Sequence, residues 1–230
     1  MTQSPDDAFA PTLRTELHRV ARRAVYDRER IYEILDEALV CHVGFLDQGQ
    51  PFVIPTIAAR VGDALFLHGS RASRMLRLLS SGAPACVTVT LLDGLVLARS
   101  AFHHSMNYRS VVILGVGREV TDGEEKLAAL RAISEHVLPG RWDAVRLPTE
   151  QELAATTVVF FPLEEVSAKV RSGPPADDEA DYALPIWAGV IPLTLRAGLP
   201  EPDSRLAPGV PVPRHVQQYD SPGRPRTSGR

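Results

Sequence analysis

Residues Leu65–Leu79, with the sequence LFLHGSRASRMLRLL, are the part of this chain that says most about its fold. An apolar stretch ends at a histidine and a glycine, a polar corner follows, and the remainder has the pattern of a short amphipathic helix. Ser70 stands at the predicted N-cap of that helix. One helical face is formed by residues at the i, i+3, i+4 and i+7 spacing, namely Ala72, Met75, Leu76 and Leu79. The stretch therefore predicts a strand, a corner and a helix.

The first turn of this helix carries a hydroxyl and a guanidinium, from Ser73 and Arg74. Helix N-termini have unpaired N–H groups and a partial positive charge, so they suit anions. The two side chains would complete a cradle for a phosphate. The alternative is a helix that caps itself, with Arg74 on a solvated face. That alternative stays open because arginine is the usual cation of this chain, whose only lysines are Lys126 and Lys169.

The rest of the chain predicts hairpin-linked strands with helices at the corners. Helices are expected over residues 27–38, capped by Asp27, and over 123–137, with Leu127, Leu130, Ser134 and Val137 on one face. The expected strands are residues 38–46, 51–60, 64–68, 83–91, 95–100, 108–120 and 156–170, the last interrupted by Pro162. Turns are expected at 47–50 and at 93–94. This order favours a mainly β protein, an antiparallel barrel that is closed or nearly closed.

Prolines and glycines inside these strands carry positional information. Pro51 and Pro55 argue for irregular or edge pairing, and Gly115 and Gly117 argue for a bulge or a close backbone approach. The strands do not alternate with helices, no GxGxxG follows a strand, and no GxxxxGK[ST] occurs. A doubly wound nucleotide-binding sheet is therefore not expected.

Composition limits the class of protein. The 230 residues suffice for one domain: we expect a flexible N-terminus (1–20), a barrel domain (21–195) and a Pro/Gly/Arg-rich tail (196–230). The net charge of −3 gives no electrostatic case for nucleic acid or an anionic membrane, and no apolar run approaches the ~18 residues of a spanning helix. The segment MTQSPDDAFAPT is acidic and polar, unlike a signal peptide.

The two cysteines, Cys41 and Cys86, lie in apolar strand-like runs, with no CxxC or Cys/His metal spacing. We expect buried free thiols, no metal site and a cytoplasmic location. Neither a GxSxG motif nor a basic setting for either cysteine is present, so no nucleophile is expected.

Two segments near strand ends could contact a ligand. His68, next to Gly69, would lie beside a cofactor ring or a phosphate; alternatively it is a strand-end histidine bonded to a loop carbonyl. Residues 107–110, Asn-Tyr-Arg-Ser, open an otherwise apolar strand, either as a rim that faces a ligand or as a polar strand entry.

Three further places have both a functional and a structural interpretation. The adjacent His103 and His104 would point to opposite faces of a strand, which favours a surface loop over a metal site. Lys169, which ends a strand with Arg171 on the same side, would pair with an anionic ligand or be solvated. Trp187 would fill a pocket or an interface, or pack locally.

Several blocks together resemble one superfamily. HGSRASRML (68–76), GAPACVTV (82–89), NYRSVVILGVGREV (107–120), KVRSGPP (169–175) and WAGVIPL (187–193) occur in this order. They resemble the pyridoxamine 5′-phosphate oxidase-like flavin-binding split barrels, particularly the branch of nitroimidazole-resistance-type flavoproteins, over about residues 22–193. The resemblance implies a six-stranded split barrel that forms a homodimer, with two FMN sites at the subunit interface.

The resemblance also implies roles for individual residues. Ser73 and Arg74 match the phosphate-binding pair, His68 and Gly69 match the strand end beside the phosphate and ribityl chain, and Trp187 would reach across from the second subunit. The expected cofactor-binding residues are Val53, Ile54, Pro55, Thr56, Ile57, His68, Gly69, Ser70, Ser73, Arg74, Met75, Asn107, Tyr108, Arg109, Ser110, Lys169 and Trp187.

The chain departs from the oxidase proper in ways that argue against pyridoxamine phosphate as substrate. Met75 replaces a basic residue, Ala58 replaces a lysine, and the C-terminal RL-x-PR-type signature is missing. We therefore expect an FMN-dependent oxidoreductase that takes electrons from a nicotinamide donor and reduces a small nitroaromatic or quinone-type compound. The flavin would do the redox chemistry. Arg109 or Lys169 would stabilise the reduced flavin, and His68 would deliver a proton.

Two alternatives remain open. The first is a flavin- or haem-binding storage protein without fast turnover, in which His68, His103 or His104 would be the axial ligand. The second is a deazaflavin-dependent reductase, which would favour a basic groove that the net charge does not suggest.

Overall fold

The computed structural model describes residues 7–220. The first part of the expected flexible N-terminus (1–6) and the end of the expected tail (221–230) lie outside the described residues, and the division into three regions stays a prediction. Within residues 7–220, no helix is long and apolar enough to cross a membrane.

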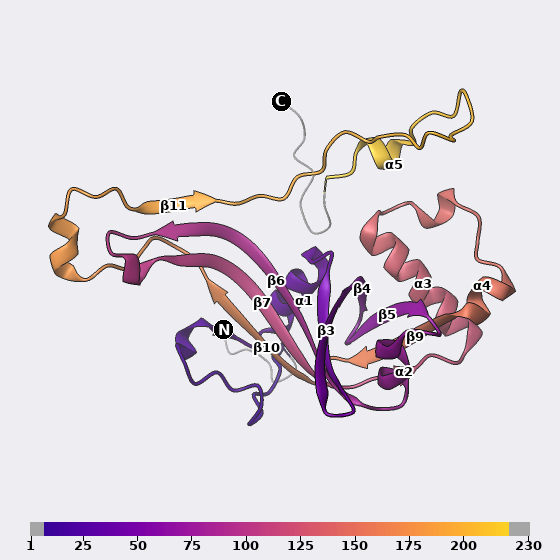
Figure 1. The fold of residues 1–230 in the computed structure, drawn as a ribbon, viewed down its shortest axis with the longest axis horizontal. Helices are drawn as coiled ribbons and strands as arrows, with labels where there is room; N and C mark the ends of the chain where they lie inside the picture. Colours follow the sequence, from indigo (N-terminus) through magenta and orange to yellow (C-terminus); the bar gives the residue numbers. More distant parts are fainter. Residues whose placement is uncertain (1–6, 221–230) are drawn as a thin grey trace.

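Two antiparallel sheets form the body of the molecule (Figure 1). The larger sheet has the order β1-β10-β7-β6-β2-β3, with β11 added on β6, and the smaller has the order β4-β5-β9-β8. The strands are β1 (Ala24–Val25), β2 (Cys41–Asp47), β3 (Gln50–Thr56), β4 (Ala58–Val61), β5 (Ala64–Ser70), β6 (Pro84–Leu97), β7 (Ser105–Val116), β8 (Arg118–Glu119), β9 (Thr156–Pro162), β10 (Glu165–Arg171) and β11 (Gly189–Pro192). The fold is the expected mainly β split barrel.

Three long predicted strands are interrupted. This corrects the continuous strands expected over 51–60 and 108–120, whereas the interruption expected at Pro162 is confirmed, since β9 ends there. The chain passes from the larger to the smaller sheet at Ile57, between β3 and β4, and at Gly117, between β7 and β8. It passes back between β9 and β10. A Cβ at Gly117 would lie 2.7 Å from Cγ1 of Val159, so this crossing needs a glycine. The expected close approach is confirmed there.

The turn predicted at Asp93-Gly94 is wrong. β6 continues through it and pairs with β7 along its length, with only a bulge between Leu92 and Gly94. A Cβ at Gly94 would lie 2.9 Å from Cγ1 of Val190, so this glycine admits the neighbouring strand β11 instead of reversing the chain. The resulting β6–β7 hairpin extends away from the rest of the molecule, with β11 alongside (Figure 1).

The β2–β3 hairpin forms as predicted. Gln48 and Gly49 both have positive φ, 50° and 80°, which is the backbone of a two-residue hairpin turn. β3 is an edge strand, paired only with β2, as Pro51 and Pro55 indicated.

The helices begin largely where side-chain caps predict. Asp27 accepts the N–H of Arg30 at 2.8 Å and Asp122 accepts that of Glu125 at 2.8 Å, which starts α1 and α3. The N-cap of α2 is Ser73, not the predicted Ser70, because the chain first makes a turn at residues 70–73. The helices are α1 (Arg28–Glu37), α2 (Arg74–Ser80), α3 (Gly123–Val137), α4 (Glu150–Ala155), α5 (Arg214–Gln217) and the 3-10 turns η2 (Ala21–Arg23), η3 (Ala101–His103), η4 (Trp142–Ala144) and η5 (Glu179–Ala183).

The smaller sheet is covered on both faces. Leu67 and its neighbours on one face belong to the main core, together with α1 and α2. Phe66 and its neighbours on the other face pack with Ala129 and Ile133 of α3. Since alternate residues of β5 face opposite sides, neighbouring residues of this strand serve different sites.

The N-terminal segment is in part packed on the barrel. Phe9 is only 2% exposed, its N–H donates to the carbonyl of Tyr26, and Ala8 pairs with Asp27. Beyond residue 195 the chain is mostly irregular, apart from α5, which comes close to α3: Cβ of His215 would lie 3.5 Å from a Cβ at Gly140.

Candidate functional site

The corner before α2 presents two serine hydroxyls. The Oγ atom of Ser70 accepts the N–H of Ala72 at 3.2 Å, and that of Ser73 accepts the N–H of Leu76 at 3.4 Å. Each hydroxyl acts as an acceptor within the protein, so its own proton can be donated to an anion. The corner thus caps itself and still retains donors, and the phosphate cradle stays a prediction.

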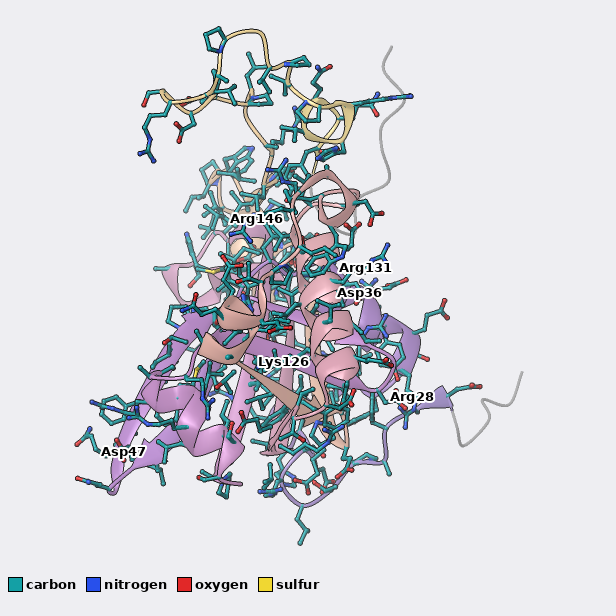
Figure 2. All side chains as sticks on the ribbon, turned by 90° about the vertical axis from the view of Figure 1, so that its right-hand side faces the viewer. Arg28, Asp36, Asp47, Lys126, Arg131 and Arg146 are labelled. Carbon is teal, nitrogen blue, oxygen red and sulfur yellow. The ribbon has the colours of Figure 1, made fainter. Side chains whose placement is uncertain are left out.

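Arg74 connects this corner to the β2–β3 hairpin. Its Nε lies 3.4 Å from an oxygen of Asp47, which is near the end of that hairpin (Figure 2), and its guanidinium lies 4.6 Å from the ring centre of Phe52. The side chain of Arg74 is 51% exposed. Ser73 and Arg74 therefore lie beside the turn end of the β2–β3 hairpin, at Asp47 and Phe52, whereas the predicted residues 53–57 extend along β3 away from that end.

His68 points away from that corner. A Cβ at Gly69 would lie 3.0 Å from Cδ1 of Leu76 in α2, so the face of β5 that includes Gly69 is the one toward α2. His68 lies on the opposite face and is paired with Val158, toward α3. The structure thus does not bring His68 together with Ser73 and Arg74 in one chain, and a proton-donor role beside a flavin held there stays a prediction.

His68 instead lines an open pocket of about 840 Å³. Its lining comes from α3, from the segment between α3 and α4, from α4, and from Ile57, His68 of β5 and Thr156 of β9. The lining residues are Ile57, His68, Leu130, Ile133, Ser134, Val137, Leu138, Arg141, Trp142, Arg146, Pro148, Glu152 and Thr156. Cofactor sites have this character: about 300–1,000 Å³, mostly apolar, with a few polar groups.

The imidazole of His68 is held without a protein partner. Its Nδ1 is buried and has no hydrogen-bond partner in the described part of the chain. Burial lowers the pKa of His68 below its ordinary value, which favours the neutral ring. A neutral, unpaired imidazole in a pocket is the form that binds a metal or accepts a proton.

The rim of the pocket carries charge. Arg146 (labelled in Figure 2) binds Glu152 through both of its terminal nitrogens, at 2.7 and 2.5 Å, and this holds the pKa of Glu152 down at about 2. Glu152 also closes the capping box of α4 with Thr149. Arg141 has no ion pair among residues 7–220. It is therefore the cation at this rim that remains available to an anionic group.

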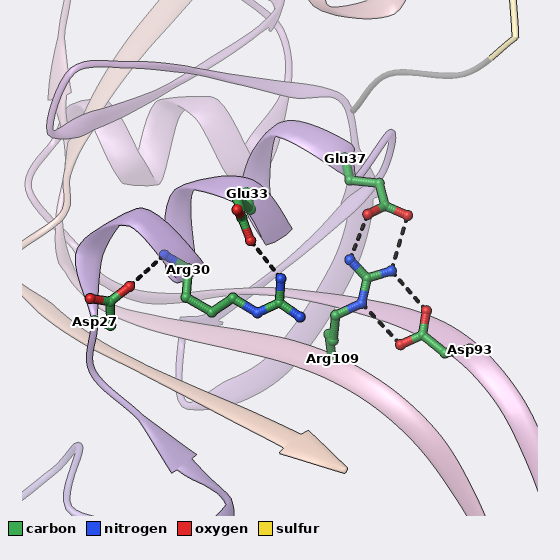
Figure 3. Close-up of polar contacts among 6 residues, drawn as sticks. All are labelled: Asp27, Arg30, Glu33, Glu37, Asp93 and Arg109. Carbon is green, nitrogen blue, oxygen red and sulfur yellow. Dashed lines mark hydrogen bonds and ion pairs between the residues drawn. The ribbon is translucent and has the colours of Figure 1, made fainter. Parts of the chain in front are cut away.

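Arg109 is engaged by two carboxylates (Figure 3). Its guanidinium donates to Glu37 at 2.5 and 3.0 Å and to Asp93 at 2.9 and 2.7 Å. These hydrogen bonds raise the pKa of Arg109 above its ordinary value, and the bonds to Asp93 make the largest contribution. The residue thus ties the end of α1 to the bulge of β6, and its predicted role toward a flavin stays a prediction.

Asn107 and Ser110 of the predicted rim have structural partners. Asn107 donates to the carbonyl of Gly173 at 3.1 Å and accepts from Arg171, and the hydroxyl of Ser110 donates to the carbonyl of Lys169 at 3.3 Å. The ammonium of Lys169 has no ion pair in the described part of the chain, which is compatible with both a solvated strand end and an anionic partner, so its predicted role stays a prediction.

The histidine pair and the tryptophan lie on the projecting hairpin or near it. His103 contacts Asp178 at 3.4 Å, and Nδ1 of His104 is 2.9 Å from the carbonyl of Ser100. No group of three or more His, Cys, Asp or Glu within residues 7–220 could hold a metal ion. Trp187 is 67% exposed.

Sequence reasoning missed the pocket beside His68, although part of its signal was visible. Leu130, Ser134 and Val137 were predicted to share one helical face, and they line the pocket. The contribution of Arg141 and Trp142 had no signal in the sequence, because these residues come from an irregular segment.

Comparison with known proteins places this fold. Residues 27–170 match the family described as pyridoxamine 5′-phosphate oxidase. A search of curated proteins gave no match. The chain is similar to the flavocytochrome Anf3 from Azotobacter vinelandii, with 43% identity over 92% of this chain and 98% of that one and a TM-score of 0.87.

Two further solved structures are similar. An FAD and haem binding protein from Mycobacterium smegmatis is 38% identical, over 88% of this chain and 100% of that one, with a TM-score of 0.84. A putative 5-nitroimidazole antibiotic resistance protein from Bacteroides thetaiotaomicron is 26% identical, over 64% of this chain and 86% of that one, with a TM-score of 0.53. With the family match covering more than half of its residues, this chain belongs to the pyridoxamine 5′-phosphate oxidase family.

Proposed function

We propose that this protein is a flavin-binding oxidoreductase that also binds haem. The observation that carries the proposal is the extent of the similarity to two proteins named for both kinds of cofactor. A match over 92% of the chain must include residues after 170, where the family match ends. The 5-nitroimidazole resistance protein matches only 64% of the chain.

The corner before α2 fits the phosphate end of a flavin nucleotide. Ser70 and Ser73 have hydroxyl protons to donate, and Arg74, half exposed, supplies charge beside them. β3 lies across from Arg74 and has one free edge, whose backbone groups are available to the isoalloxazine ring. When bound, a flavin supplies hydride and electron transfer. We propose FMN, and FAD is the alternative that the name of the mycobacterial relative supports.

We further propose a homodimer with the flavin at its interface. Large apolar side chains are exposed on β3 and on the projecting hairpin and its neighbouring loop: Val53 is 67%, Phe102 88% and Trp187 67% exposed. Large exposed apolar side chains of this kind are typical of protein–protein contacts. Light scattering of the purified protein should give twice the chain mass, and a monomer would refute this part.

The oxidoreductase activity rests on the family and on the cofactor chemistry. A nicotinamide donor would reduce the flavin, and a small nitroaromatic or quinone-type compound would reoxidise it, in a cytoplasmic setting. A deazaflavin-dependent reaction is the competing interpretation, which a colourless, blue-fluorescent protein would favour.

One experiment tests the cofactors together. The absorbance spectrum of the purified protein should show a flavin band and a Soret band, and mass spectrometry of the released chromophores should identify FMN or FAD, and haem. Anaerobic addition of NADH or NADPH should bleach the flavin band. A protein that binds neither chromophore when each is supplied would refute the proposal.

A further inference from the structure

We infer that the pocket between the smaller sheet and α3 is the haem site, with His68 as the axial ligand of the iron and Arg141 as the partner of a haem carboxylate. The inference rests on the proposed function, since it locates one of the two proposed cofactors.

The shape and lining of the pocket suit a large, planar, mostly apolar ring. Three apolar side chains of α3, those of Leu130, Ile133 and Val137, line the pocket together with Leu138, which caps the helix. Trp142 and Ile57 add further apolar surface. The volume of about 840 Å³ lies toward the upper end of the usual range for cofactor sites, ~300–1,000 Å³. A small metabolite would leave much of this apolar surface exposed to water.

A single histidine stands in the floor of this pocket. His68 has a buried Nδ1 without any partner in the described chain, and burying an unpaired polar atom costs free energy unless another role compensates. A histidine side chain is the commonest protein ligand of haem iron in oxygen-binding and peroxidase proteins. Its position on β5, between two paired strands, fixes the face of the sheet from which the side chain projects.

The charges at the rim match a ligand with carboxylates at one edge. Arg141 is without an ion pair in the described residues, whereas Arg146 is neutralised by Glu152. A carboxylate placed here would therefore find one available guanidinium, and the bidentate geometry of arginine suits it.

The other histidines fit less well. His103 and His104 have partners on the projecting hairpin, and Nε2 of His136 is 2.9 Å from the carbonyl of Ala38. His215 resembles His68 in having a buried nitrogen without a partner, but it packs against Gly140 and does not line this pocket. His215 is therefore the matched control.

The test compares His68→Gly with His215→Gly in the full-length protein, each titrated with haemin in the presence of bound flavin. We expect His68→Gly to bind haemin at least about tenfold more weakly, since losing even an outer partner of a metal ligand costs that much, and to shift the Soret band. Added imidazole should restore the wild-type spectrum. His215→Gly should match the wild type.

A second variant guards against misfolding of the first. Ser134→Trp leaves His68 intact and fills the pocket, so it should exclude haemin while flavin content and far-UV circular dichroism stay unchanged. Arg141→Ala should weaken haemin binding without altering the iron spectrum.

The outcomes separate the inference from the proposed function. If the wild type binds haemin and both His68→Gly and Ser134→Trp bind it with the same affinity and spectrum, the site is elsewhere and only the inference fails. If the wild type binds no haemin at all, the haem part of the proposed function fails and the inference falls with it.

Discussion

Replacing Arg109 with methionine should destabilise the protein strongly, because the substitution leaves two carboxylates facing each other without their cation. Arg109, Glu37 and Asp93 have side chains that are 15%, 18% and 35% exposed, so water reaches the network only in part. Breaking a fully buried pair costs about 3–5 kcal/mol, and partial exposure reduces that. We expect a loss of about 2–3 kcal/mol in the free energy of unfolding.

Urea unfolding of the flavin-free protein, followed by far-UV circular dichroism, measures this loss. Arg118→Met is the matched control, since Arg118 forms one ion pair, with Glu125, at an exposed site, where such pairs contribute about 0–1 kcal/mol. Arg109→Lys should recover only part of the loss, because an ammonium cannot form two hydrogen bonds to each of two carboxylates, as the guanidinium does. A loss for Arg109→Met no larger than that for Arg118→Met would refute the structural role assigned to the network.

Three further predictions follow from local geometry. Gly117→Ala should destabilise the protein by about 1–3 kcal/mol in the same assay, because its Cβ would overlap Val159, whereas Gly123→Ala, with open space around it, should not. Ser73→Asp should keep the cap of α2 and weaken flavin binding by charge repulsion, whereas Ser73→Ala should cost about 1 kcal/mol of stability; equal flavin affinity in both variants and the wild type would contradict the phosphate corner. Burial raises the pKa of Cys41 to about 12 from its ordinary 9, so the folded state keeps a proton that the unfolded state loses; the thiol should stay unreactive to a disulfide reagent at pH 8, and the free energy of unfolding should fall as pH rises from 9 toward 12.

Local signals in the sequence predicted most helices and strands. Features that depend on contacts between distant parts of the chain could not be predicted. Asp27 and Asp122 act through hydrogen bonds to residues three positions away, so α1 and α3 could be placed from the sequence alone. The transfer of the chain at Ile57 and Gly117 depends on where the other sheet lies, which no short window records. Asp93-Gly94 has the composition of a turn, but a glycine is needed there because β11, nearly a hundred residues away in the chain, packs against it.

The candidate site was likewise predicted only in part. Ser73, Arg74 and β3 were predicted as neighbours from a resemblance over the whole superfamily, and the structure brings them together. His68 was singled out from its place at a strand end, but the side of the strand on which it lies decides what it can contact. That side depends on the pairing with Val158 and on the position of α3.

The edge of β3 has a consequence for how copies of this chain can associate. A strand added to a sheet needs N–H donors at alternate positions along the edge that it joins. Pro51 and Pro55 have no N–H to offer, and between them only a short length of backbone remains. A second chain therefore cannot extend this sheet into a continuous intermolecular ribbon, which protects an exposed apolar edge from fibre-like growth. Any contact made there has to be formed through side chains or by a small molecule.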